Sequence, residues 1–178
     1  TRTPDVAGLD ATAFLEREYP CDAAIVDHLR GLPGRVQVGE LCGTAEFIES
    51  IPLDYGWAGR IATFSGRPGV CGWSRHVWQF TGKLRHGPAA GTPTRDRFRQ
   101  YEFHMLAAYL AAQRHSNAVG ARDFLDDLGV THVVLGVPEH RLFPWVKGAD
   151  LADALGGRVE FETGPGCAVI RLEPRASR

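Results

Sequence analysis

The chain has 178 residues, a mass of 19.5 kDa and an ordinary globular composition, with 44% hydrophobic and 23% charged residues. Twenty Lys and Arg residues nearly balance 21 Asp and Glu residues, and this balance gives no electrostatic reason to expect a nucleic-acid partner. No apolar run approaches the roughly 18 residues of a membrane span, and no secretory leader is evident. We expect residues 1–178 to form one domain. Because the chain begins at Thr1 and its only methionine is Met105, we also expect it to be a piece of a longer protein.

The first half of the chain predicts a helix followed by two strands. Residues 21–32 have the apolar spacing of a helix, which we expect Asp22 to cap. Residues 35–41 alternate as a strand, and the apolar run over residues 60–64 predicts a second one. Residues 67–94 are rich in proline and glycine, so we expect a long structured loop there.

The second half predicts three helices and three strands. Residues 98–114 form a helix with Leu106 and Leu110 inward, and Asn117 caps another whose apolar stripe includes Leu125. Residues 131–137 (THVVLGV) predict a strand covered on both faces, and residues 150–155 a short helix. Residues 158–162 and 168–172 predict a terminal hairpin.

This alternation of helices and strands predicts an α/β fold. Crossovers between successive strands favour a three-layer sandwich with a mostly parallel sheet. The C-terminal hairpin would then form an antiparallel edge.

The four cysteines do not have the spacing of a metal site. They lack a CxxC pair and paired histidines, so we expect no zinc, and no motif predicts a cofactor. Three disulfide connectivities are possible, and Cys42–Cys71 is the first to consider because these residues flank consecutive predicted strands. The alternative is that all four are small buried hydrophobic residues. A disulfide would place the domain outside the cytosol.

The chain lacks the common catalytic motifs. It contains no GxSxG, no GxxxxGK[ST] and no GxGxxG after a strand. Only His76 lies among other candidate site residues, where it would act as an acid or base near neutral pH, although no carboxylate is close in sequence to orient it. We expect His28, His104 and His115 to be solvated or at edges, and His132 to be a structural imidazole.

The segment over residues 59–80, GRIATFSGRPGVCGWSRHVWQF, carries most of the functional information. Tryptophans with polar tips among glycines suit a groove that holds flat or hydroxylated groups. The alternative is that Trp73 and Trp78 cap the core. Glu40 ends a predicted strand, and we expect Arg60 to face it in an ion pair that orders the loop. The candidate binding residues are Trp73, Arg75, His76, Trp78, Gln79, Arg60 and Glu40.

This segment resembles a stretch near "RISTFTGLPTVLGWPGHEWQWRG" in the YYY family of multi-pass membrane proteins, glycosyltransferases of the lipid-linked-sugar type. The segments DAAIVDHLRGLPGRVQVGELCG, GARDFLDDLGVTHVVLGVPEHRLFP and RVEFETGPGCAVIRLE are similar to other parts of that family in the same order. The family's motif positions are occupied by Gly66, Pro68, Val70, Gly72, Trp73, His76, Trp78 and Gln79. The chain departs from the family at Ser74, Arg75 and Val77, where the family tends to have proline, glycine and glutamate.

The resemblance implies an accessory domain on the extracytoplasmic face of the membrane. It would recognise or position a sugar or an acceptor, with the transmembrane portion of the parent chain as its partner. The family's catalytic carboxylate belongs to loops between membrane helices, so this part would be inactive alone. A competing hypothesis is a free-standing α/β enzyme or ligand-binding protein that uses His76 in a cleft.

Overall fold

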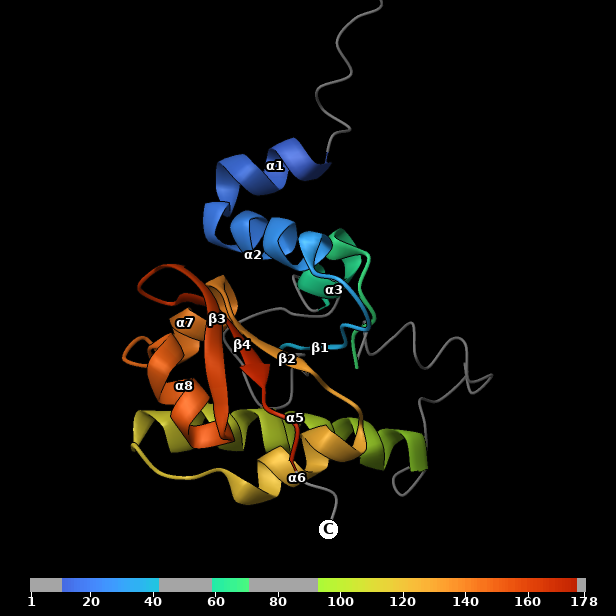
Figure 1. The fold of residues 1–178 in the computed structure, drawn as a ribbon, viewed down its shortest axis with the longest axis vertical. Coiled ribbons are helices and arrows are strands. Elements are labelled where there is room, and N and C mark those ends of the chain that lie inside the picture. The colour runs from blue at the N-terminus through green and yellow to red at the C-terminus, as the bar shows by residue number, and fades with distance from the viewer. Residues whose placement is uncertain (1–10, 42–58, 71–92, 176–178) are drawn as a thin grey trace, which may run out of the picture.

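The computed structural model describes residues 11–41, 59–70 and 93–175. These residues form a mixed α/β fold in which seven helices surround a four-stranded mixed sheet (Figure 1). None of the helices in this part of the chain is long and apolar enough to cross a membrane.

The sheet has the strand order β1-β2-β4-β3 and combines both directions of pairing. Its strands are β1 (Val38–Gly39), β2 (His132–Leu135), β3 (Gly157–Gly164) and β4 (Cys167–Leu172). β1 and β2 pair in parallel, whereas β4 pairs antiparallel with both β2 and β3. The predicted strands around residues 38 and 133 and the predicted terminal hairpin are therefore present. One of the three pairings among the described strands is parallel.

One face of the sheet is covered by the N-terminal helices. α1 (Ala11–Glu18), α2 (Pro20–Gly31) and α3 (Arg60–Ser65) lie together on this side (Figure 1). Ile25 and Leu29 of α2 belong to the same buried cluster as Val134 and Val169 of the sheet. α2 lies where the spacing of apolar residues predicts it.

The opposite face is covered by α5 (Pro93–Gln113), α6 (Val119–Asp127) and α8 (Gly148–Leu155). The sheet residues Val133, Leu135 and Ile170 alternate with those that face α2, and they pack against Met105 and Leu151. α7 (Val137–Leu142) follows β2 directly. Alternate residues of β2 and β4 are therefore buried on opposite sides, which explains their continuous apolar sequence.

The prediction of a strand over residues 60–64 is wrong, because these residues form α3. Gly59 and Gly66 lie at its two ends with φ of 70° and 68°, a left-handed conformation that glycine adopts readily. The carboxylate of Glu40 accepts hydrogen bonds from the first-turn amides of Ile61 and Ala62 at 3.1 and 3.0 Å. A cap supplied from a distant element overrides the local strand preference, and no local pattern reveals it.

Two expected details of α5 and α6 also differ from the structure. Leu110 is 41% exposed and Leu106 is only partly buried, while Tyr101 and Tyr109 face the core. The tyrosines are tolerated there because their hydroxyl groups donate to buried main-chain carbonyls. Asn117 does not cap α6, whose N-cap is Ala118 without a side-chain bond.

A disulfide joins Cys21 at the start of α2 to Cys167 at the start of β4, with their Cα atoms 5.6 Å apart. The interpretation of all four cysteines as buried hydrophobic residues is therefore wrong. Cys42 and Cys71, the first pair considered, lie outside the described residues. The bridge spans 146 positions of the sequence. By the chain-entropy argument, closing a loop of this length stabilises the fold by about 5 kcal/mol.

Candidate functional site

The structure describes two of the seven candidate binding residues. Glu40 and Arg60 lie in the described part of the chain, and they are in contact. The other five lie outside it: Trp73, Arg75, His76, Trp78 and Gln79.

The Arg60 guanidinium is the centre of a buried charge cluster, which we call the Arg60 centre and which comprises Arg60, Asp22, Glu40 and Glu139. Arg60 Nε lies 2.6 Å from Asp22 Oδ2, and its Nη2 lies 2.7 Å from Glu139 Oε2. Its Nη1 lies 3.3 Å from Glu40 Oε2. The side chain of Arg60 is 1% exposed, and those of the three acids are at most 2% exposed. One cation therefore faces three carboxyl groups away from water.

All five N–H donors of Arg60 have acceptors. Nε and Nη2 bond to the two oxygens of Asp22, the second at 3.4 Å. Nη1 bonds to Glu40 and, at 3.4 Å, to Glu139, while Nη2 also bonds to Glu139. Such planar, forked pairing is specific to arginine, because a lysine ammonium offers only three donors from one atom.

Main-chain amides also donate to the carboxylate oxygens of the centre. Asp22 accepts from Val137 N at 2.9 Å, and Glu139 accepts from Leu41 N and Gly136 N at 3.1 and 3.0 Å. Glu40 accepts from the two amides of α3 described above. The centre therefore joins α2, the end of β1, α3 and the start of α7. Asp22 does not act as the expected helix cap, because its oxygens are committed to Arg60 and Val137.

Burial and like charge perturb the titration of this centre. Burial raises the pKa of Glu40 to about 7, and the nearby Glu139 adds to the rise, although Arg60 and the amides of Ala62 and Ile61 oppose it. Burial alone would lower the pKa of Arg60, but the three carboxyl groups together raise it above its ordinary value. Arg60 is therefore the fixed charge, and Glu40 is the group whose charge changes near neutral pH.

α5 closes the centre with a tyrosine. Tyr101 Oη donates to the main-chain oxygen of Glu40 at 2.8 Å and accepts from the amide of the same residue at 3.0 Å. Burial raises the pKa of Tyr101 well above its ordinary value, so this hydroxyl stays neutral. With every donor of Arg60 used and no exposed face, the centre is built to hold elements together and not to contact a substrate.

The centre fixes the first part of the tryptophan-rich segment. α3 begins at Arg60. Beyond this helix, Val38 N donates to Pro68 O at 2.8 Å and Val70 N donates to Val38 O at 3.3 Å. Val70 also packs against the buried cluster that includes Met105 and Leu151. Gly66, Pro68 and Val70, three positions of the motif, therefore lie on a segment anchored beside β1.

Two arginines connect α2 and α3 near this anchor. Arg67 Nε donates to Leu29 O at 2.9 Å, and its Nη2 donates to Arg30 O and Leu32 O at the C-terminal end of α2. In the opposite direction, Arg30 donates twice to Phe64 O, the closer bond being 2.7 Å. Cationic groups at helix C-termini satisfy the last carbonyls and complement the helix dipole.

A second polar cluster surrounds His132, as expected of a structural imidazole. Its Nδ1 lies 2.7 Å from Thr131 Oγ1, and its Nε2 lies 2.9 Å from Glu160 Oε2. His28, expected in solvent or at an edge, is partly buried, and its ring stacks on Phe161 with centroids 4.6 Å apart. No His, Cys, Asp and Glu group in the described ranges is arranged to hold a metal ion.

Sequence reasoning did not identify Asp22 and Glu139 as partners of Arg60. Glu139 follows the carboxyl end of β2, where α/β folds gather polar groups, and this was the one available signal. Asp22 lies 38 positions from Arg60 in an ordinary helical first turn, and only the packing of α2 on α3 reveals its role.

Comparison with known protein families, with curated proteins and with solved structures yields no match to this chain.

Replacing Arg60 by methionine is expected to lower the free energy of unfolding by about 3–5 kcal/mol, because three buried carboxyl groups lose their cation. Urea denaturation measures this loss. The matched control is Arg158→Met, whose side chain is 58% exposed beside Glu173 and whose removal is expected to cost less than about 1 kcal/mol. Equal losses for the two variants would show that the centre is not a major source of stability.

The raised pKa of Glu40 predicts a specific pH dependence of stability. Between the ordinary value of about 4.5 and the folded-state value of about 7, the folded protein holds this proton more tightly than the unfolded chain. The stability that the protonated Glu40 contributes to the folded state is therefore fully present below pH 4.5, and it is lost as the pH rises through 7.

Glu40→Gln keeps a neutral side chain at every pH, so wild type should lose stability relative to Glu40→Gln as the pH rises from 5 to 8. Denaturant titrations at each pH measure the difference. A difference that is flat, or that changes in the opposite direction, would contradict the shifted titration.

Proposed function

We propose that this chain is an extracytoplasmic accessory domain of a membrane glycosyltransferase. In this role it binds or positions the sugar or the acceptor, and the transmembrane portion of the parent chain carries out the transfer. The observation that carries the proposal is the disulfide between Cys21 and Cys167. The resemblance of the tryptophan-rich segment to the YYY family supplies the class of reaction.

The disulfide favours an oxidising compartment. Structural disulfides persist outside the cytosol, where the glutathione and thioredoxin systems do not reduce them. This one connects elements from opposite ends of the described chain and lies beside the buried cluster that includes Val169. Its position suits a permanent structural bridge, which is what a domain on the outer face of a membrane would need.

The Arg60 centre supports a recognition role for the segment that follows it. The centre and the pairing of residues 68–70 with β1 hold the start of the motif on a rigid base. Binding groups act best when their supporting residues are already in place. We propose that Trp73 and Trp78 stack on a sugar or line the face toward the membrane portion, with Arg75, His76 and Gln79 beside them.

We also propose that the complete fold is a three-layer α/β sandwich with a mostly parallel sheet. Helices on both faces of the described sheet support the layers. The parallel bridge between Val38 and Gly69 on the far side of β1 supports further parallel pairing at that edge.

The first test determines the redox state of Cys21 and Cys167 in the native cells. Cells are quenched in acid, free thiols are blocked with one maleimide, and the protein is reduced and labelled with a second maleimide of different mass. Peptide mass spectrometry should find the second label on both residues, because a disulfide protects them from the first. Finding the first label on both residues would indicate a reducing compartment and overturn the proposed location.

The second test measures binding of a short-chain polyprenyl-phosphate sugar to the 178-residue chain. Each of its four tryptophans gives one indole N–H signal in a nitrogen-resolved NMR spectrum, and the signals of Trp73 and Trp78 should shift on titration. Trp73→Ala should weaken binding by up to about tenfold, the size expected of one aromatic stacking contact.

Phe103→Ala is the control for this titration, since Phe103 is an aromatic residue of α5 that is 64% exposed. It should leave binding unchanged. Equal binding by wild type and Trp73→Ala would remove the stacking role and favour the free-standing protein that uses His76.

A further inference from the structure

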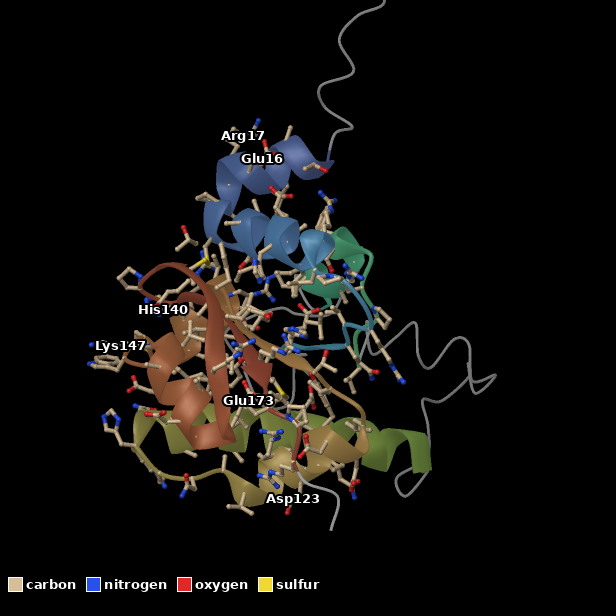
Figure 2. All side chains as sticks on the ribbon, viewed as in Figure 1. Glu16, Arg17, Asp123, His140, Lys147 and Glu173 are labelled. Carbon is tan, nitrogen blue, oxygen red and sulfur yellow. A yellow bond between two sulfur atoms is a disulfide. The ribbon has the colours of Figure 1, made fainter. Side chains whose placement is uncertain are left out.

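An open cavity of about 550 Å³ lies where the end of α5 meets the segment between α7 and α8. This volume is within the range of small-molecule sites. Figure 2 shows Lys147 projecting outward beside the segment between α7 and α8. The lining residues are Ala112, Gln113, His115, Trp145, Lys147 and Asp150.

Trp145 is the most exposed large hydrophobic residue in the described part of the chain, with 73% of its surface accessible. Its neighbours Phe143 and Val146 are buried, so the segment is held in place while the indole remains in solvent. An indole exposed at the wall of a cavity offers apolar surface that a bound ligand can remove from water. Its flat apolar face suits the C–H face of a pyranose ring.

His115 occupies a position where helices usually have glycine. α5 ends in a Schellman motif, in which Ser116 N donates to Ala111 O at 2.9 Å and His115 N donates to Ala112 O at 3.0 Å. His115 has a φ of 50°, a left-handed conformation that is uncommon for residues with side chains. A glycine would have no side chain here, whereas the His115 imidazole places its Nδ1 3.4 Å from Asp150 Oδ1 at the cavity.

The polar groups of the cavity offer both donors and acceptors with balanced charge. Lys147 donates, Asp150 accepts, and the Gln113 amide does both. Asp150 is held in position because its Oδ2 accepts from Lys147 N at 3.0 Å. Hydroxyl groups also donate and accept, so they match this set. One cation and one anion leave no excess charge to select an ionic ligand.

We propose that this cavity binds a short neutral saccharide, with one pyranose ring on Trp145 and its hydroxyls bonded to Asp150, Gln113 and Lys147. This site is separate from the proposed contacts of Trp73 and Trp78, and the inference goes beyond the proposed function. It is argued from the cavity alone, so it stands even if the domain is not part of a glycosyltransferase.

The test titrates the 178-residue chain with maltotriose, chitotriose and mannotriose and follows the four indole N–H signals. The signal lost in Trp145→Phe identifies Trp145, and it should shift in a saturable way with at least one trisaccharide. Trp145→Ala should weaken that binding by about tenfold or more, and Gln113→Ala by about threefold. Because Trp145 is exposed, its substitution should leave the fold unchanged. The control Phe103→Ala should leave saccharide binding unchanged.

A parallel titration with vesicles of phosphatidylcholine and phosphatidylglycerol tests the other use of an exposed Trp and Lys pair, contact with a membrane surface. Broadening of the Trp145 signal by vesicles without any response to the trisaccharides would overturn the proposal. The absence of any response to either would do the same. Shifts of Trp73 and Trp78 in these spectra report on the separate site, so the two proposals succeed or fail independently.

Discussion

The fold depends on satisfying one buried guanidinium. Removing Arg60 and its three carboxyl partners from water costs several kcal/mol for each ion, and only their mutual attraction and a full set of hydrogen bonds offset this cost. Those bonds come from α2, the end of β1, α3 and α7, of which α7 is far from the other three in the sequence (Figure 1). If any one element is missing, the others leave a buried charge without a partner. The Arg60 centre therefore makes the packing of these elements an all-or-none event.

The disulfide and the Arg60 centre act on the same turn of α2. Cys21 is bonded to the start of β4, and the adjacent Asp22 bonds to Arg60. Fixing Cys21 against the sheet reduces the conformational freedom that Asp22 must lose to reach the guanidinium. The covalent and ionic constraints therefore support each other, and we expect their contributions to stability to be non-additive because the residues are neighbours.

Sequence patterns identified the elements with strong periodicity but not those fixed by distant contacts. α2, β2 and the terminal hairpin follow from apolar spacing, because the core selects it directly. α3 could not be predicted, since its first turn is capped by Glu40 from another element. The inward face of α5 was misassigned because Tyr101 and Tyr109 bury hydroxyl groups on acceptors that only the tertiary fold provides. Glu40 and Arg60 were paired correctly. Asp22 and Glu139 were missed, because only the tertiary fold brings them to the guanidinium.

α5 links the Arg60 centre to the Trp145 cavity. Tyr101 fixes the helix to the main chain of Glu40, and twelve residues later Gln113 forms part of the cavity wall. At 1.5 Å per residue, the two points are about 18 Å apart along a continuous helix. This helix is packed against both α6 and α8, so it has little freedom to bend or shift between them. A ligand in the cavity therefore meets a wall whose position is set by the same buried charges that anchor the start of the tryptophan-rich segment.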